Sequence, residues 1–561
     1  MRVLGIEGTA WAASAAVFEA PGDAPTHARS DDADPEVVFG PDSEVVFVET
    51  DPYQPESGGI HPREAAEHMS DAVPRVVEAA LDRAAERASA DGDPPVDAVA
   101  FSRGPGLGPC LRIVGTAARS LSQALSVPLV GVNHMVAHLE VGRHQSGFDS
   151  PVCLNASGAN AHLLGYHNGR YRVLGETMDT GVGNAIDKFT RHVGWSHPGG
   201  PKVERAARDG EYVDLPYVVK GMDFSFSGIM SAAKDAYDDG TPVDDVCFSL
   251  QEHVFAMLTE VSERALSLTG TDELVLGGGV GRNERLREML AEMCDERGAD
   301  FYAPDPRFLG DNAGMIALLG AKMFAAGDTL DVAESAVDPN FRPDQVPVTW
   351  RGEAESVARA LTGDGDVRGA EATVTVGPDR VEKRRLPKGY RHPALDERLR
   401  RERTVAEARL TSEARRDGVP TPLVLDVDVA EATLTLQRVG EADLAADLTE
   451  ARARTVGEYL AALHRAGVVH GDPTTRNVRV GDRTVLIDFG LGYHSGHVED
   501  HAMDLHVFEQ SVEGTADDPE PLVRAFEEGY AAAGDDAVLS RLRVIEGRGR
   551  YQSESASATG E

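Results

Sequence analysis

Two histidines in the first half of the chain have the spacing of metal ligands. His134 and His138 lie four residues apart in the run NHMVAHLE, so both imidazoles project from one face if the segment is helical. Imidazoles at this spacing can hold one metal ion, although two unrelated surface histidines would show the same pattern. Met135 stands where zinc peptidases have a general-base glutamate, which removes the main support for peptide hydrolysis.

A carboxylate much further along the chain is a candidate third ligand. Asp311 lies in LGDNAGMIA, at the start of a stretch with helical character. A carboxylate in this place either caps the helix or faces a cleft as a metal ligand, and the sequence leaves both interpretations open. Between the histidines and Asp311, small residues surround single polar ones, as in a polar substrate pocket. These runs are LNASGANAH (154–162), NAIDKF (184–189) and HPGGPKVE (197–204).

A second group of polar residues has the pattern of a nucleotide site. In HGDPTTRN, Asp472 comes five residues before Asn477, and an apolar strand then leads to Asp488 in a DFG triplet. This spacing is typical of a kinase catalytic loop and its metal site. Asp472 would accept the hydroxyl proton or orient the acceptor, and Asn477 and Asp488 would hold Mg²⁺ against the phosphates of ATP.

Two charges upstream fit the same nucleotide site. Lys383, in DRVEKRR, fits the lysine that contacts the phosphates, and Glu407 fits its ion-pair partner; two solvated surface charges are the alternative. The chain has only seven lysines among its 55 cations, and a compact ammonium suits a phosphate, so a retained lysine favours the functional interpretation. Lys388 is the other candidate for the lysine that contacts the phosphates.

Two departures from the sequence pattern of ordinary protein kinases limit the activity that this second site can have. The phosphate loop reads Gly369, Ala370, Glu371, Ala372 in place of a run with three spaced glycines, and no APE element follows the DFG triplet. Both departures indicate an ATPase or a restricted kinase rather than a general protein kinase.

The elements that must position the first group of residues form an α/β pattern. Strands and helices alternate to about residue 327, which predicts layered sheets with many parallel strands. Glycine turns after apolar strands can cradle phosphate, because backbone amides approach an anion closely there. Three such turns suit two halves that grip a nucleotide; they are Gly5–Gly8, Gly104–Gly108 and Gly277–Gly281. The expected strands are 2–6, 12–18, 44–50 and 96–102, and the expected helices are 62–89 and 112–125.

A polar stretch separates this part from the rest of the chain. Residues 20–43 are rich in Pro, Asp and Gly and predict a surface insertion, and the polar run 352–368 predicts a linker region. A hairpin over ATVTVG and DRVEKRRL and a charged helix over 394–416 follow. We expect a first domain at 1–340, a linker at 341–365, a second domain at 366–551 and a disordered tail at 552–561.

Composition restricts the class of protein. The formal net charge is -38, and the 55 cations comprise seven lysines and therefore 48 arginines. An acidic chain depleted of lysine is typical of adaptation to a salt-rich cytoplasm, where charges are screened over about 3 Å. Four scattered cysteines argue against a disulfide framework. The sequence shows no charged-then-apolar leader and no long apolar run, so we expect a cytoplasmic protein without a membrane partner.

Nine motifs occur in the order in which a known family has them. The set VLGIEGTA, SRGPGLGPCLR, NHMVAH, NASGAN, NAIDKF, HPGGPKVE, DFSFSG, GGGVGRN and GDNAGMIA resembles the tRNA threonylcarbamoyl transferases in their archaeal and eukaryotic branch. The resemblance covers roughly residues 1–340 and implies an α/β actin-like (ASKHA) double domain. It implies transfer of threonylcarbamoyl from threonylcarbamoyl-AMP to N6 of the adenosine next to the anticodon, in tRNAs that read codons beginning with A.

The same resemblance implies roles for particular residues. His134, His138 and Asp311 would hold one Fe²⁺ or Zn²⁺ ion. The family has a tyrosine near the metal where this chain has Asn155, and an amide oxygen is a weaker ligand than a phenolate. The adenylate substrate would contact Asn155, Ala156, Ser157, Gly158, Ala159, Asp187, Gly200, Glu204 and Asn283.

A second resemblance covers about residues 366–551. The run EKRRLPKGYRHPALDERLRRERTVAEARL, the run HGDPTTRN and the terminal IEGRGRY resemble the small atypical kinase of the KEOPS complex. This implies an α+β bilobal minimal protein-kinase fold whose ATPase activity supports tRNA modification, with small accessory KEOPS subunits as partners. Asp472 would be catalytic, and ATP with Mg²⁺ would bind at Gly369, Ala370, Glu371, Ala372, Lys383, Glu407, Asn477 and Asp488.

The sequence therefore predicts a bifunctional enzyme that acts on tRNA, threonylcarbamoyl-AMP and ATP. It offers no evident nucleophile, which favours direct transfer without a covalent enzyme intermediate. Three alternatives remain: a protein Ser/Thr kinase with a regulatory actin-like domain, a tRNA-binding scaffold with a structural metal, and a metalloprotease. Scattered arginines are candidates for tRNA contact; they are Arg143, Arg191, Arg541 and Arg548.

Overall fold

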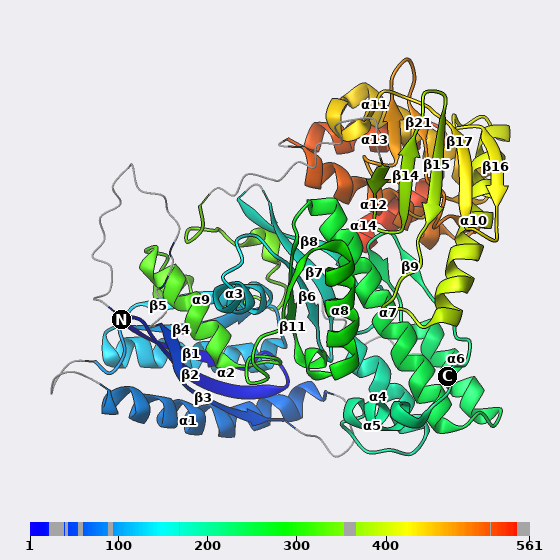
Figure 1. Ribbon diagram of the computed structural model, residues 1–561. Helices are drawn as coiled ribbons and strands as arrows, with labels where there is room; N and C mark the ends of the chain where they lie inside the picture. Colours follow the sequence, from blue (N-terminus) through cyan, green and yellow to red (C-terminus); the bar gives the residue numbers. More distant parts are fainter. Residues whose placement is uncertain are drawn as a thin grey trace, which may run out of the picture.

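The computed structural model describes residues 1–21, 37, 39, 43–53, 60–87, 94–167, 169–352, 366–516 and 518–546. Figure 1 shows two units in contact, one from blue to green and one from yellow to red. Most of the predicted insertion at 20–43, the later part of the linker, the tail at 552–561 and Arg548 lie outside the described residues. Among those described, no helix is both long and apolar enough to cross a bilayer.

The first unit contains two five-stranded sheets. Their strands are β1 (Arg2–Glu7), β2 (Ala12–Glu19), β3 (Glu44–Pro52), β4 (Ala98–Gly104), β5 (Leu129–Asn133), β6 (Val152–Ala156), β7 (Ala161–His167), β8 (Arg170–Glu176), β11 (Glu273–Gly277) and β12 (Asp300–Tyr302). The orders are β3-β2-β1-β4-β5 and β12-β11-β6-β7-β8. These strand orders correspond when the second sheet is read from β8 to β12. In each sheet the central strand pairs antiparallel on one side and parallel on the other. This repetition fits the predicted α/β double domain.

Helices cover both sheets of the first unit (Figure 1). They are α1 (Pro62–Glu86), α2 (Gly108–Leu125), α3 (His134–Ser146), α4 (Val182–His192), α5 (Gly200–Ala206), α6 (Ser227–Asp238), α7 (Val243–Thr269), α8 (Glu284–Arg297) and α9 (Ala313–Ala325). α2 begins four residues before the predicted 112, because Pro109 suits a first helical turn. α9 packs tightly on β1, since a Cβ atom added to Gly5 would lie 2.5 Å from the carbonyl oxygen of Ala313.

The second unit joins an antiparallel sheet to a mainly helical part. The sheet has the order β13-β14-β15-β17-β16. Its strands are β13 (Asp366–Arg368), β14 (Ala372–Val376), β15 (Arg380–Arg385), β16 (Val424–Asp428) and β17 (Thr433–Gln437). The helices are α10 (Pro393–Arg416), α11 (Glu450–Arg465), α12 (Val498–Thr515), α13 (Glu520–Ala531) and α14 (Asp536–Glu546), and β19 (Val468–Val469), β20 (Val478–Val480) and β21 (Val485–Leu486) are short strands near α11. The predicted hairpin and charged helix are both confirmed.

The first residues of the predicted linker pack against the first unit. Trp350 is fully buried in its core. The guanidinium of Arg351 lies 3.8 Å from the ring centre of Tyr166. The chain therefore remains attached to the first unit as far as residue 352.

A short loop of the second unit inserts into the first. Tyr390, between β15 and α10, is fully buried in the core of the first unit, and its hydroxyl donates to Glu263 at 3.1 Å. His392 stacks on Tyr212 with ring centres 4.4 Å apart. The buried Tyr390 and the stacked His392 hold the two units against each other.

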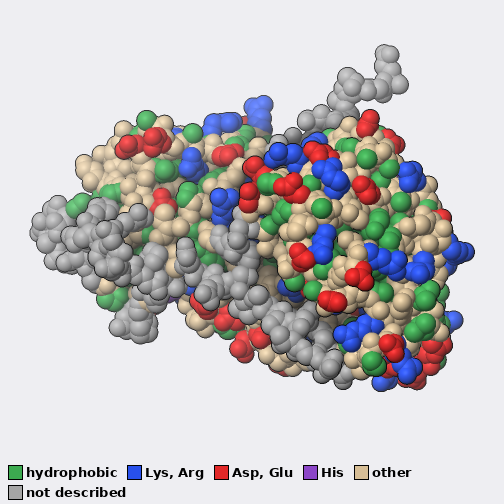
Figure 2. Space-filling model, turned by 90° about the horizontal axis from the view of Figure 1, so that it is seen from above, with side chains coloured by type: hydrophobic (Ala, Val, Ile, Leu, Met, Phe, Trp, Pro, Cys, Tyr) green, Lys and Arg blue, Asp and Glu red, His purple; other side chains and the backbone are tan. Residues whose placement is uncertain are grey.

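The surface carries charges of both signs. Figure 2 shows acidic and basic side chains interspersed over the face seen from above. Arg143 is not part of this surface: it is buried, and its Nε donates to the carbonyl oxygen of Asp149 at 2.8 Å. It is therefore not available for tRNA, whereas Arg191 is exposed and Arg541 pairs with Glu499.

Candidate functional site

The predicted metal ligands meet where two helices begin. Asn133 caps α3 by accepting hydrogen bonds from two backbone amides, so His134 and His138 occupy its first turns. Nε2 of His134 lies 3.3 Å, and Nε2 of His138 3.8 Å, from Oδ1 of Asp311. One potential ligand atom from each of the three residues lies within 4.8 Å of the others. The sequence therefore identified a real cluster.

The helix-cap interpretation of Asp311 is wrong. Asn312 is the N-cap of α9, and its side-chain oxygen accepts from the amide of Met315 at 3.2 Å. The carboxylate of Asp311 is left to face the two histidines. Burial alone would raise the pKa of Asp311, but the histidines outweigh it and hold that pKa well below its usual range.

Glu7, which the sequence analysis missed, orients the first histidine. Nδ1 of His134 donates to Oε2 of Glu7 at 3.1 Å, and Oε1 of this fully buried carboxylate accepts from the amide of Thr9 at 2.8 Å. Burial would lower the pKa of His134, but Glu7 and Asp311 raise it to about 10. A carboxylate behind a histidine is a common outer partner in metal sites, because it fixes the tautomer.

Several buried polar atoms near this cluster have no hydrogen-bond partner among the described residues. They are both ring nitrogens of His138 and Oδ1 of Asn155. Buried polar atoms are nearly always paired, so one ring nitrogen of His138 and Oδ1 of Asn155 suit a bound cation. Imidazole and oxygen donors of this kind fit iron or zinc.

Asn155 lies on β6 beside a residue that the sequence analysis also missed. His162 faces it on β7, with Nε2 at 3.5 Å from Nδ2 of Asn155. Burial lowers the pKa of His162 to about 3, so its ring is neutral and accepts the amide hydrogen. This contact turns Oδ1 of Asn155 toward the glycine turn, where a Cβ atom added to Gly278 would lie 2.5 Å away.

The predicted adenylate residues also lie near one another. Oδ1 of Asp187 accepts from the amide of Gly199 at 2.7 Å, immediately before Gly200 opens α5. Oε1 of Glu204 accepts from the amide of Glu284 at 3.0 Å, and Asn283 caps the same helix, α8. These contacts join α4, α5 and α8 around one region.

The run 155–159 borders that region. The amide of Asn184, in α4, donates to the carbonyl oxygen of Gly158 at 2.9 Å. Trp11, from the other half of the unit, stacks on His197 with ring centres 5.8 Å apart, and His197 in turn contacts Asp187 at 3.0 Å. The region therefore lies between the two halves. Trp11 and His197 were not singled out from the sequence.

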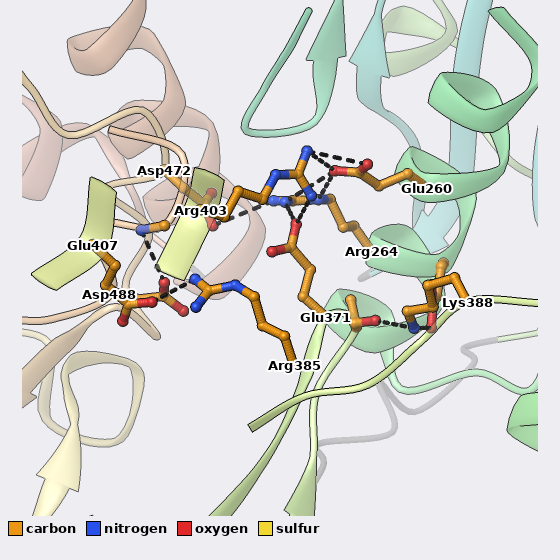
Figure 3. Close-up of polar contacts among 12 residues, drawn as sticks. Glu260, Arg264, Glu371, Arg385, Lys388, Arg403, Glu407, Asp472 and Asp488 are labelled. Atoms are coloured by element: carbon orange, nitrogen blue, oxygen red, sulfur yellow. Dashed lines mark hydrogen bonds and ion pairs between the residues drawn. The ribbon is translucent and has the colours of Figure 1, made fainter. Parts of the chain in front are cut away.

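The residues of the second unit that are predicted to bind the nucleotide form a second cluster (Figure 3). Nζ of Lys383 lies 2.6 Å from Oδ1 of Asp488 and donates to Glu407 at 3.1 Å. Nδ2 of Asn477 donates to Oδ2 of Asp472 at 2.9 Å. Desolvation would raise the pKa of Asp488, but Lys383 outweighs it and the pKa is lowered. Burial instead raises the pKa of Asp472.

The structure distinguishes the two competing lysines. Lys388 lies 2.5 Å from Glu263, a residue of α7 in the first unit, and also donates to the carbonyl oxygen of Ala370. Lys388 therefore joins the two units, whereas Lys383 lies among the residues predicted to bind ATP. Arg385, missed by the sequence analysis, is a second cation on Glu407.

A profile of the tRNA N6-adenosine threonylcarbamoyltransferase family matches residues 44–318. Proteins named as probable bifunctional tRNA threonylcarbamoyladenosine biosynthesis proteins match the whole chain. That of Haloarcula marismortui is 68% identical over 98% of this chain and 100% of the relative, and that of Halobacterium salinarum is 68% identical over 100% of both. That of Methanocorpusculum labreanum is 49% identical over 98% of this chain and 99% of the relative.

The chain belongs to this bifunctional family. The predicted resemblance to a tRNA threonylcarbamoyl transferase fused to a second enzyme is thus confirmed. The adaptation to a salt-rich cytoplasm inferred from composition agrees with relatives from Haloarcula and Halobacterium. In this bifunctional protein both clusters lie on one chain, which holds them at a ratio of one to one.

Proposed function

We propose that the first unit transfers threonylcarbamoyl from threonylcarbamoyl-AMP to N6 of the adenosine next to the anticodon, and that the second unit is an atypical kinase whose ATPase activity supports this reaction. The observation that carries the proposal is the cluster of His134, His138 and Asp311, held in a member of the bifunctional family. The tRNAs concerned are those that read codons beginning with A.

The residues around the cluster have distinct proposed roles. His134, His138 and Asp311 would hold Fe²⁺ or Zn²⁺, with the amide oxygen of Asn155 as a weak additional donor. When bound, such an ion supplies Lewis-acid chemistry. Glu7 fixes the orientation of His134 through its hydrogen bond. The adenylate would lie against 155–159, Asp187, Gly200, Glu204 and Asn283, which border one region between the two halves.

The transfer itself needs no enzyme nucleophile. N6 of adenine attacks the carbonyl carbon of the mixed anhydride, the bond to the phosphate oxygen breaks, AMP leaves with the electron pair, and N6 loses one proton to solvent. The target base must be unstacked to reach the cluster, as in other enzymes that modify bases. Small accessory KEOPS subunits would assist, and a separate enzyme must supply the adenylate.

For the second unit we propose a bilobal kinase fold with an ATPase function. Lys383 and the loop 369–372 would contact the phosphates, while Asn477 and Asp488 would hold Mg²⁺ and Asp472 would orient the attacking oxygen. The ion pair of Lys383 with Glu407 supports this assignment, since such a pair is needed in active kinases.

A single-turnover assay at high KCl tests the transferase proposal. The full chain, accessory subunits and tRNA receive threonylcarbamoyl-AMP, and mass spectrometry measures threonylcarbamoyladenosine. We expect product with the wild type and none with His134→Ala or Asp311→Ala. His192→Gln is the matched control, because that histidine pairs with Asp238 on the surface. Absence of product from a folded, metal-loaded wild type would refute the transferase proposal.

A further inference from the structure

The catalytic aspartate of the second unit has a cationic partner in the first unit. Nη1 of Arg264, near the end of α7, lies 3.7 Å from Oδ2 of Asp472. This is the one ion pair that Asp472 makes among the residues of the described ranges. Figure 3 shows Arg264 reaching across from the helix of the first unit. A charge from one catalytic unit therefore enters the site of the other.

The position of Arg264 is fixed by the contacts of its helix. Glu260, one turn earlier, is buried and accepts from Arg391 at 2.7 Å and from Arg403 at 3.2 Å, both of the second unit. Glu263 is buried and pairs with Lys388. Buried ion pairs are weakly screened by salt. The helix is thus held to the second unit even in a salt-rich cell.

The guanidinium of Arg264 links two parts of the nucleotide site. On one side it pairs with Glu371 in the phosphate loop 369–372, and Glu371 also pairs with Arg403 at 2.7 Å. On the other side it approaches Asp472. The terminal phosphate of a nucleotide held by Lys383 and Asp488 would enter between these two carboxylates.

The face of Asp472 toward the first unit is covered. The turn between β9 (Val219–Lys220) and β10 (Asp223–Phe224) belongs to the first unit, and a Cβ atom added to Gly221 would lie 3.7 Å from Oδ1 of Asp472. Nζ of Lys220 pairs with Asp500 of the second unit at 2.5 Å. Because this turn lies against Asp472, it leaves little room there for a protein acceptor, which favours water as the acceptor.

We propose that Arg264 is a catalytic residue of the ATPase in the second unit, where its guanidinium contacts the γ-phosphate of ATP. This inference rests on the ATPase function proposed above. Without nucleotide, Glu371 neutralises the guanidinium. When ATP binds, the γ-phosphate replaces Glu371 as the partner of Arg264, so that the docked transferase unit completes the hydrolytic site.

The hydrolytic step balances with water as the acceptor. The oxygen of water attacks the γ-phosphorus, and Asp472 accepts one of its protons. The bond between the γ-phosphorus and the bridging oxygen breaks, and ADP leaves with the electron pair. Two N–H groups of Arg264 stabilise the charge on the γ-phosphoryl oxygens, as arginines do in other nucleotide hydrolases. The products are ADP, inorganic phosphate and a proton.

Phosphate release from MgATP by the full chain at high KCl tests this inference. We expect Arg264→Gln to lower kcat about 100-fold or more, with KM within about threefold, because the lost contact is made chiefly in the transition state. Added guanidinium at low concentration should restore part of the rate. Arg454→Gln is the matched control: it removes an arginine of the second unit that pairs with Glu528 on the surface, and its kcat should stay within about threefold of the wild type.

Two further variants separate the possible failures. Asp488→Asn should abolish turnover; if it does not, the proposed ATPase itself is wrong, and this inference falls with it. If Asp488→Asn is inactive but Arg264→Gln retains wild-type turnover or exceeds it, Arg264 is not catalytic. Arg264→Lys keeps the positive charge between Glu260 and Glu371 and should therefore fold. Binding of ADP to this variant checks that its nucleotide site is intact. We expect the variant to lose about tenfold in kcat, and unchanged kcat would overturn the inference.

Discussion

The metal cluster and the nucleotide cluster differ in how their charges are balanced. In the metal cluster, the ring nitrogens of His138 are buried without a hydrogen-bond partner among the described residues. In the nucleotide cluster, Lys383 pairs with two carboxylates, and Arg264 pairs with Glu371. The first cluster therefore keeps the ring nitrogens of His138 outside any hydrogen bond with the described residues, although His134 pairs with Asp311, whereas the cations of the second cluster must exchange partners when its ligand binds.

The two clusters also differ in what holds them together. His134, His138 and Asp311 lie on elements of one unit, at the starts of two packed helices. The nucleotide cluster receives Arg264 from the other unit and depends on how the units dock. From this difference we expect the first site to depend on the metal and the second to depend on the interface.

The largest expected effect is that of His138→Ala on the transferase. Loss of a metal ligand should reduce formation of threonylcarbamoyladenosine about 1000-fold or more, since a metal contributes several kcal/mol to such a step. Mass spectrometry of nucleosides measures the product, and elemental analysis measures bound metal. If stability falls while modification persists, the metal is structural and the protein is the scaffold of the alternative interpretation.

A pair of lysine variants tests the second cluster. Lys383→Met should lower ATP turnover about 100-fold, because the ammonium pairs with Asp488 and would contact phosphate. Lys388→Met should lower turnover much less, because Lys388 contacts Glu263 and the backbone of Ala370 at the interface rather than Asp488. Phosphate release measures both variants. Equal losses would show that the lysine nearest the nucleotide has been misassigned.

A smaller effect is expected from Glu7→Gln. The carboxylate orients His134 from behind, and removal of such a partner lowers metal affinity about 10- to 100-fold. Competition with a chelator measures the affinity without an activity assay. Glu78→Gln, an exposed position on α1, is the control. Unchanged metal affinity in Glu7→Gln would contradict the orienting role.

The smallest effect on catalysis is expected from a buried charge outside both clusters. Glu140 is fully buried and accepts from Lys322 at 2.7 Å. Glu140→Gln leaves Lys322 buried without its counter-ion, which should lower the free energy of unfolding by about 3 kcal/mol, with kcat of both activities unchanged in the folded protein. Arg63→Ala, in an exposed pair with Glu67, should change it by less than about 0.5 kcal/mol.

The contribution of Glu140 to stability should decrease as the pH is lowered. Burial would raise the pKa of Glu140, but Lys322, Arg143 and Arg351 outweigh it and hold the pKa far below the usual range. The stability that this carboxylate provides is therefore present above the ordinary glutamate pKa and is lost as the pH falls below it. Thermal unfolding of the wild type and Glu140→Gln should converge at low pH. A constant difference would contradict the assignment.

The sequence alone determined those features that depend on spacing along the chain. His134 and His138 are one helical turn apart, and Asp472, Asn477 and Asp488 belong to one short loop and the strand that follows. Local periodicity also placed α10 and the hairpin of β14 and β15. Such features survive in a single sequence because neighbouring residues share one backbone geometry.

Tertiary structure decided what joins distant segments. Glu7 is 127 residues from His134, and neither its strand nor its composition predicts that contact. Whether Asp311 or Asn312 caps α9 depends on which side chain lies near the free amides of its first turn; here it is Asn312. The partners of Lys388 and Arg264 depend on docking between the two units. These contacts are set by packing of buried surfaces, which no spacing rule along the chain encodes.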